Sequence, residues 1–281
     1  MHAIEVSGLR KAYGSLEAVR GVDFTIAEGE VFGLLGPNGA GKTTTVEILE
    51  GYRKRDAGEV RVLGSDPERP APDFRERIGV VLQQSQLYPN LTVLETHRVF
   101  AAYYEQPRDV DEVIDLVGLD EKRDARVKTL SGGQKRRLDL GVALVGDPDL
   151  VFLDEPTTGF DPAARRAAWE MIRSLGKTIL LTTHYLDEAE QLADRVAVLR
   201  EGRIVREGTP RELTGVFGGG ETEIHYRRNG EEVVLRTTEP TRVLHELTAR
   251  ALGDGEELEG LEVRRPTLED VYLLLTAEDA E

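Results

Sequence analysis

Short apolar runs separated by turns dominate the first 80 residues, a pattern typical of strands. Residues 4–35 read as strands, and the last of them, EVFGLL at residues 30–35, has the composition of a buried strand. A helix is expected from about Gly41, with Val46 and Leu49 facing inward. IGVVLQ at residues 78–83 is a further short apolar strand. The pattern therefore predicts a strand-rich region that contains one helix.

From Thr92 the apolar residues take up the spacing of a helix. Thr92 and Glu95 match a capping box, and apolar residues at 110, 113, 114 and 117 follow one helical face before Gly118. Ser131 and Gln134 match a second capping box, which apolar residues at 138, 142 and 145 follow. We therefore expect a helical subdomain over about residues 84–145.

Further strands are predicted after the helical subdomain. Apolar runs at residues 150–153 and 178–182 flank a predicted helix at 162–175, and strand–helix–strand at this spacing indicates a parallel sheet with a right-handed crossover. RVAVL and GRIVREG, between residues 195 and 208, make a last pair of strands. Residues 1–216 are thus expected to form one α/β domain.

The residues beyond this domain predict a small α+β lobe at 222–281. FGGGE at residues 217–221 has the composition of a linker. Asn229-Gly230 between two strand-like runs is typical of a hairpin turn. A helix over 241–252, a strand near Leu261 and a helix that begins at Thr267 complete the lobe.

The charge balance narrows the classes of partner. The chain of 281 residues has 36 basic and 52 acidic residues, a net charge of −16, which argues against sequence-independent binding to nucleic acid. The chain has no cysteine, which excludes disulfides and thiolate metal sites. This composition is compatible with a cytosolic protein. We see neither a secretory signal nor an apolar run of membrane-spanning length.

A phosphate-binding loop is predicted between the strand at 30–35 and the following helix. GPNGAGKT fits the pattern G-x-x-x-x-G-K-[ST], and the strand and helix around it disfavour the alternative of an ordinary glycine turn. Glycines let backbone N–H groups face a phosphate, Lys42 would reach the β- and γ-phosphates, and Thr43 would hold Mg²⁺. The residues expected to contact the nucleotide are Gly36, Pro37, Asn38, Gly39, Ala40, Gly41, Lys42, Thr43 and Thr44.

Two carboxylates follow the buried strand LVFL at residues 150–153. Asp154 and Glu155 come at its carboxyl end, where open α/β sheets bind ligands. Asp154 would bind Mg²⁺ through water, and Glu155 would orient and activate the attacking water. Such a pair is otherwise often a helix cap, a reading that the phosphate-binding loop makes less favourable.

LSGGQ at residues 130–134 contains two opposing helix signals. Its capping box favours the start of a helix, whereas its two glycines destabilise the first turn of that helix. Each of Gly132 and Gly133 costs about 1 kcal/mol relative to alanine in a helix. Helix starts attract anions, and glycines allow a close approach to the backbone. Since the chain already has one phosphate cradle, a second one is expected to serve another molecule's nucleotide. Its residues would be Ser131, Gly132, Gly133 and Gln134.

The combination of GPNGAGKT, LSGGQ and LVFLDEP resembles the ATP-binding cassette (ABC) ATPases over about residues 4–213. The resemblance implies a P-loop NTPase core with a parallel sheet, an antiparallel β edge and a helical subdomain. It also implies a subunit that binds ATP and Mg²⁺ and dimerises around two Mg-ATP, each held between the P-loop of one copy and LSGGQ of the other. Such a subunit powers a separate membrane permease at the cytoplasmic face of the membrane.

The resemblance assigns four more positions. Gln83 matches the glutamine that contacts Mg²⁺ and the attacking water, although Gln84 and Gln86 are close in register. Asp161 matches an aspartate at the dimer seam, and His184 matches the histidine that contacts the γ-phosphate. Tyr13 matches the aromatic residue that stacks on adenine, with simple packing as the alternative. The family commonly has leucine where Phe160 stands, a departure expected to change packing only.

The C-terminal segment narrows the class of transporter. PTLEDVYLLLT at residues 266–276 resembles a segment of ATPase subunits from exporters of drugs, lipids or polysaccharides. The alternatives are an importer ATPase, or a soluble ABC ATPase that acts on ribosomes or DNA. The sequence leaves open the cargo, the choice between an identical and a different partner cassette, and whether the lobe is a dimer brace or a regulatory piece.

Overall fold

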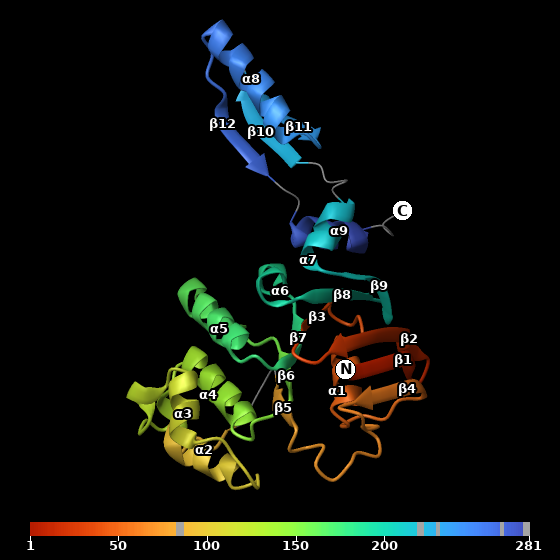
Figure 1. The fold of residues 1–281 in the computed structure, drawn as a ribbon, viewed down its shortest axis with the longest axis vertical. Helices are drawn as coiled ribbons and strands as arrows, with labels where there is room; N and C mark the ends of the chain where they lie inside the picture. Colours follow the sequence, from red (N-terminus) through yellow and green to blue (C-terminus); the bar gives the residue numbers. More distant parts are fainter. Residues whose placement is uncertain (83–86, 218–221, 229–230, 265–266, 278–281) are drawn as a thin grey trace. The chain divides into compact units, whose positions relative to one another are not determined.

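The protein is described by a computed structural model that covers residues 1–82, 87–217, 222–228, 231–264 and 267–277 (Figure 1). Its residues group into two compact units, 1–207 and 208–281. The second unit begins before the predicted linker, because helix α7 (Pro210–Phe217) packs against helix α9 (Leu268–Ala277). Apart from Phe217, the predicted linker at 217–221 lies outside the described residues.

A six-stranded sheet forms the centre of the larger unit. Its order is β5-β6-β7-β3-β8-β9, and the first five strands are parallel. The predicted strand–helix–strand unit is confirmed, since helix α5 (Pro162–Ser174) connects β6 to the parallel strand β7. The strands are β5 (Ile78–Val81), β6 (Leu150–Asp154), β7 (Thr178–Thr183), β3 (Val31–Leu35), β8 (Arg195–Arg200) and β9 (Arg203–Gly208).

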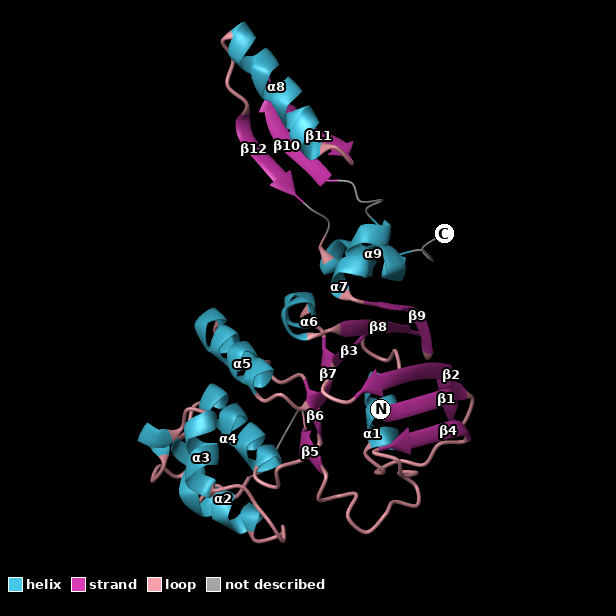
Figure 2. Ribbon diagram, viewed as in Figure 1, coloured by secondary structure: helices cyan, strands magenta, loops and turns pink. Residues whose placement is uncertain are grey.

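An antiparallel sheet lies to one side of the central sheet (Figure 2). It has the order β2-β1-β4, built from β1 (His2–Tyr13), β2 (Leu16–Ala27) and β4 (Ala57–Val62). Its apolar face shares a core with the central sheet and with helix α1 (Lys42–Leu49), in which the rings of Phe24 and Phe32 stack at 5.4 Å. The sequence pattern predicted β1, β2 and β3 but not β4.

Three helices form the predicted helical subdomain, on the other side of the central sheet (Figure 1). They are α2 (Val93–Ala101), α3 (Val110–Leu116) and α4 (Gly132–Leu144), with short 3₁₀ turns at Asp120–Lys122 and Val127–Thr129. Both capping boxes are confirmed: Thr92 and Glu95 cap α2, and Ser131 and Gln134 cap α4. A second apolar core joins these helices to the far face of β5, β6 and β7.

Helices α2 and α4 meet at His97 and Gly141. His97 is fully buried, and its Nδ1 lies 2.9 Å from the carbonyl oxygen of Val93. A Cβ atom at position 141 would overlap the His97 ring. Burial lowers the pKa of His97. Gly141 is therefore required by the packing of these two helices.

The described residues of the smaller unit form a three-stranded antiparallel sheet of order β11-β10-β12 and three helices. The predicted hairpin strands are confirmed as β10 (Thr222–Arg228) and β11 (Glu231–Thr237), although Asn229 and Gly230 lie outside the described residues. Helix α8 (Pro240–Asp254) packs on β10 and ends at Gly255, whose φ is +69°. The remaining strand is β12 (Glu259–Arg264).

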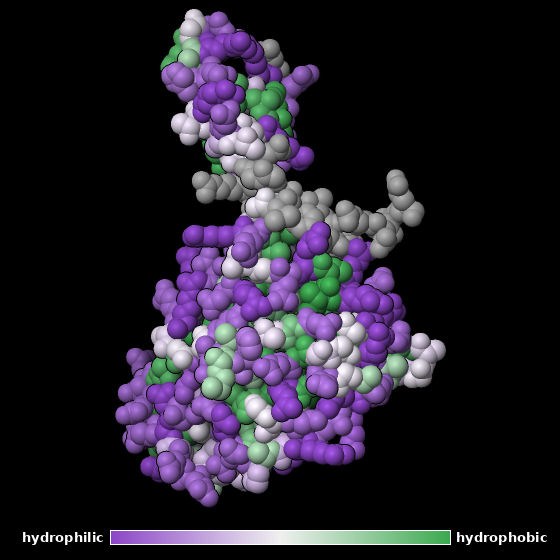
Figure 3. All heavy atoms as spheres, turned by 45° about the vertical axis from the view of Figure 1, so that its right-hand side comes forward, coloured by the Kyte–Doolittle hydropathy of each residue, from purple (hydrophilic) through white to green (hydrophobic). Residues whose placement is uncertain are grey.

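Hydrophilic residues cover most of the face in Figure 3, and hydrophobic residues appear on it in small separate groups. Among the described residues, no helix combines the length and apolar character needed to cross a membrane.

Candidate functional site

The predicted site residues meet at the carboxyl ends of three adjacent parallel strands. β3 ends at Leu35, directly before the phosphate-binding loop, and Leu35 pairs with Thr183 of β7. Asp154, the last residue of β6, pairs with Thr182 on the other side of β7. His184 follows β7 directly. The sheet therefore brings together the loop at 36–43, the carboxylates and the histidine, as expected for a ligand site of an open α/β sheet.

The phosphate-binding loop depends on its glycines. Gly39 and Gly41 have φ values of +81° and +105°, a left-handed region that disfavours residues with a Cβ atom. A Cβ at Gly41 would also overlap the carbonyl oxygen of Ala18, and one at Gly36 that of Leu199. The loop leads into α1, whose N-terminus adds partial positive charge. Its geometry is that of an anion cradle.

Lys42 extends back along this loop. Its Nζ donates to the carbonyl oxygens of Gly36 at 2.6 Å and Pro37 at 3.1 Å. Burial lowers the pKa of Lys42, and the nearby charges of Glu155 and Asp154 partly oppose that shift. The Lys42 ammonium group and the two carboxylates thus interact electrostatically, between the loop after β3 and the end of β6.

The two carboxylates are held differently. Asp154 accepts a hydrogen bond from the Thr182 hydroxyl. Glu155 has a φ of +50°, a conformation that costs of the order of 1–3 kcal/mol in a residue other than glycine. Its N–H donates to the carbonyl oxygen of Thr182 at 2.9 Å, which extends the pairing of β6 with β7 beyond Asp154. Strain of this kind is typical of functional sites.

His184 contacts the side chain of Glu155. Its Nδ1 lies 2.9 Å from Glu155 Oε1, while the hydroxyl of Thr158 donates to Glu155 Oε2 at 3.3 Å. The Glu155 side chain is only 13% exposed and that of His184 is 45% exposed. The carboxylate is thus oriented by two neighbours, and the imidazole is accessible from outside the chain.

The LSGGQ segment begins α4 as its capping box predicts. The N–H of Gln134 donates to Ser131 Oγ at 3.3 Å, and the N–H of Ser131 donates to Gln134 Oε1 at 3.0 Å. A Cβ at Gly132 would have no described neighbour within 4 Å, and one at Gly133 would meet only the Phe160 ring, at 3.8 Å. Neither glycine has a positive φ. Packing among the described residues and backbone geometry therefore do not account for them.

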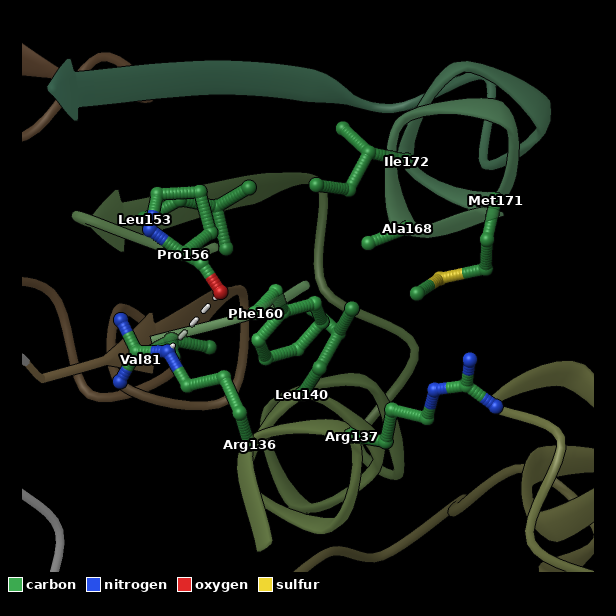
Figure 4. Close-up of a pocket in the computed structure, with 10 residues that line it drawn as sticks. All are labelled: Val81, Arg136, Arg137, Leu140, Leu153, Pro156, Phe160, Ala168, Met171 and Ile172. Carbon is green, nitrogen blue, oxygen red and sulfur yellow. Dashed lines mark hydrogen bonds between the residues drawn. The ribbon is translucent and has the colours of Figure 1, made fainter. Parts of the chain in front are cut away.

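Arg136, one turn into α4, is a residue that the sequence analysis missed. Its guanidinium donates to the carbonyl oxygen of Pro156 at 3.1 Å, as Figure 4 shows, and to that of Glu155 at 3.0 Å. It also donates to the carbonyl oxygens of Asp154 and Leu82. Arg136 therefore joins the helix that LSGGQ begins to the ends of β5 and β6. The apolar spacing does not signal it, because position 136 lies on a different face of α4 from the predicted apolar positions 138, 142 and 145.

The other predicted residues lie at the edges of this arrangement. Tyr13 is 40% exposed at the end of β1, with Lys11 and Arg53 beside its ring. Asp161 caps α5 by accepting hydrogen bonds at 2.9 Å from the N–H groups of residues 163 and 164. Phe160 is buried against α4 and α5 in the pocket of Figure 4. Gln83 follows β5 but lies outside the described residues.

Comparison with known proteins identifies the family. The ABC transporter family profile matches residues 19–158. The Nod factor export ATP-binding protein I of Rhizobium sp. (strain N33) is 43% identical to this chain, over 99% of the chain and 98% of its own length. The protein of the same name from Rhizobium meliloti (strain 1021) is 42% identical, over 99% of this chain and 89% of its own.

Solved structures of similar fold are also ABC cassettes. CbiO1 from Clostridium perfringens, part of the ABC transporter complex cbiONQ, has a TM-score of 0.68 at 30% identity, over 75% of this chain and 90% of its own. A bacterial ABC transporter cassette solved as a dimer has a TM-score of 0.66 at 26% identity, over 73% of this chain and 98% of its own. The expected fold class is confirmed, and the chain belongs to the ABC transporter family as an ATP-binding and ATP-hydrolysing subunit.

Proposed function

We propose that the loop at residues 36–43 and the ends of β6 and β7 bind ATP with Mg²⁺. They form a half-site, that is, the part of an ATP site contributed by one copy of the chain. The main support is the register that places the loop, Asp154 and His184 on adjacent strand ends. The hydroxyl of Thr43 and the carboxylate of Asp154 are oxygen donors of the kind that Mg²⁺ prefers. Bound with the nucleotide, Mg²⁺ supplies positive charge that stabilises the phosphoryl transfer. Gln83 is the third proposed metal residue.

In this proposal Lys42 and the amides of the loop bind the β- and γ-phosphates, and Glu155 acts on the attacking water. Glu155 accepts a proton from that water while His184 keeps its carboxylate oriented and contacts the γ-phosphate. The 2.9 Å contact between these two side chains supports the assignment. Tyr13 is proposed to stack on adenine, since its exposed ring ends β1.

Two identical copies are proposed to close over two ATP molecules. LSGGQ of each copy would cover the ATP held by the loop of the other, with Asp161 at the seam. The support is the unfilled space at Gly132 and Gly133, which a partner's phosphate could approach. A similar cassette is solved as a dimer. Binding of ATP would then favour a closed dimer, and hydrolysis would release it.

ABC ATPase subunits work with membrane permeases, and we propose that this one serves an exporter of a drug, lipid or polysaccharide. Relatives that match almost the whole chain are named export proteins, which favours export over import. The chain would then lie at the cytoplasmic face of the membrane through its permease. Co-expression with a permease encoded nearby should bring it to the membrane fraction, whereas sedimentation with ribosomes would support the alternative function.

The test of the half-site is the substitution Glu155→Gln. We expect the rate of phosphate release to fall by about 10²–10⁴-fold, because an amide cannot accept the proton of the attacking water. ATP with Mg²⁺ should then accumulate the dimer, measured by light scattering. Glu170→Gln, an exposed change on α5, is the matched control and should hydrolyse ATP normally. A Glu155→Gln protein that stays monomeric with ATP and Mg²⁺ would contradict the proposed dimer.

A further inference from the structure

Glu188 is a buried carboxylate with no part in the site described above. It lies in the first turn of α6 (Leu186–Leu192) and is 0% exposed. Its Oε1 accepts hydrogen bonds from the hydroxyl of Thr157 at 2.6 Å and from the indole N–H of Trp169 at 3.2 Å. Burial raises the pKa of Glu188, and the hydrogen bonds from Thr157 and Trp169 oppose that shift.

The partners of Glu188 lie on the segments that carry the proposed chemistry. Thr157 stands two residues after Glu155 in the loop that leads to Asp161. Trp169 lies on α5, the helix that Asp161 caps. Glu188 itself comes four residues after His184. One buried group on α6, the helix that follows β7, thus touches both the loop after β6 and helix α5.

These contacts form a closed ring. Glu155 is joined to Thr157 through the backbone, and the hydroxyl of Thr157 donates a hydrogen bond to Glu188. Glu188 is joined through the backbone to His184, whose side chain contacts Glu155 and so completes the ring. Loss of the contact between Thr157 and Glu188 would remove the side-chain hydrogen bond that joins the loop after Glu155 to the helix that follows His184. The strained φ of Glu155 persists only while surrounding contacts hold it, and this hydrogen bond is one contact of the same loop.

We propose that Glu188 is a positioning residue for ATP hydrolysis: through Thr157 it fixes the loop at residues 156–161 relative to His184, and so sets the orientation of Glu155. It contacts no substrate in this arrangement. The inference rests on the proposed roles of Glu155 and His184. A purely structural role would differ, because it would lower nucleotide binding, stability and turnover together.

Four substitutions in the full-length chain separate the two roles. Glu188→Leu and Thr157→Val remove the contact between Glu188 and the loop. Glu188→Gln keeps an acceptor oxygen at the same length, and Trp169→Phe removes only the hydrogen bond from α5. Turnover, KM for ATP, binding of a fluorescent ATP analogue and the unfolding midpoint are measured for each, with activity assayed well below the lowest midpoint.

Positioning predicts that Glu188→Leu and Thr157→Val lower kcat by about 10- to 100-fold, with KM and nucleotide binding changed less than about twofold. Glu188→Gln and Trp169→Phe should stay within about threefold of the unchanged protein in kcat. Normal kcat in Thr157→Val, failure of Glu188→Gln to restore kcat, or equal losses in kcat and nucleotide binding would overturn the proposal. Glu155→Gln, assayed in parallel, tests the proposed half-site separately: if it still hydrolyses ATP, the half-site is wrong whatever position 188 does.

Discussion

Glu50, at the end of α1, shows how a single buried side chain can make stability depend on pH. Burial raises the pKa of its carboxyl to about 8 from 4.5, and the charges of Asp154 and Glu47 add to the shift. Between these two values the folded chain keeps a proton that the unfolded chain has lost. Glu50 therefore favours folding at low pH, and its contribution falls as the pH rises from 4.5 to 8.

Glu50→Gln should remove this dependence, since an amide does not ionise. We expect the variant to gain stability relative to the unchanged protein as the pH rises, by on the order of 3 kcal/mol between pH values of about 5 and 9. Urea unfolding of both proteins, without nucleotide or Mg²⁺, measures the difference at each pH. Two stability curves that run parallel over this range would contradict the assignment.

At the scale of elements, the start of α4 offers a test of the exposed glycines. Gly133→Asp should abolish ATP turnover yet leave ATP binding nearly unchanged, because the new carboxylate would repel the phosphates held by a partner copy. Phosphate release and binding of a fluorescent ATP analogue separate these effects. Gly253→Asp, at a helical glycine of α8 with similar open space, is the control and should retain turnover. Equal loss of binding and turnover in Gly133→Asp would exclude a role toward the partner's nucleotide.

Arg136 tests the connection between α4 and the central sheet. Arg136→Lys keeps the charge but cannot reach the carbonyl oxygens after β5 and β6 together, so we expect a loss of about 3 kcal/mol in unfolding free energy. Turnover should fall as well, because Glu155 loses a bond that holds its strained backbone. Arg137→Lys is the control, since Arg137 makes one long bond, at 3.5 Å, to Gly118. Equal stabilities of the two variants in urea would show that the connection is unimportant.

The elements that the sequence predicted are those with local signals. Ser131 and Gln134 specify the start of α4 within four residues, and the glycines of residues 36–41 specify a loop conformation. Helix α6 was not predicted, since it has only seven residues and no side-chain cap at its start. Strand β4 was also missed, because its pairing with β1 connects residues that are far apart in the chain.

The site likewise contains features that have a local sequence signal and features that depend on the tertiary structure. The phosphate-binding loop could be predicted as a local motif, whereas the contact between Glu155 and His184 depends on the register of β6 and β7. The partners of Arg136 are backbone carbonyl groups, which every residue carries. The contacts of Arg136 could therefore not be predicted from a pattern of side chains. Gln83 stays a prediction, since it lies outside the described residues.

At the scale of the whole molecule, each copy is proposed to contribute two different half-sites. A dimer with Lys42→Ala in one copy and Gly133→Asp in the other would have both defects in one composite site and an intact second site. Each variant alone should be inactive. A one-to-one mixture should regain about one quarter of normal turnover, because half of its dimers are mixed and each has one working site of two. Tagged copies are used to verify that mixed dimers form. If they form and the mixture is still as inactive as each variant alone, the proposal that each ATP site contains residues of both copies is contradicted.

The contact between His97 and Gly141 has a consequence for how related sequences diverge. A side chain at position 141 would overlap the imidazole, so position 141 can enlarge only if position 97 shrinks. The two positions are 44 residues apart but share one volume. During evolution they are expected to change as a pair: lineages that keep histidine at 97 should keep glycine at 141, and those with a larger residue at 141 should have lost the histidine.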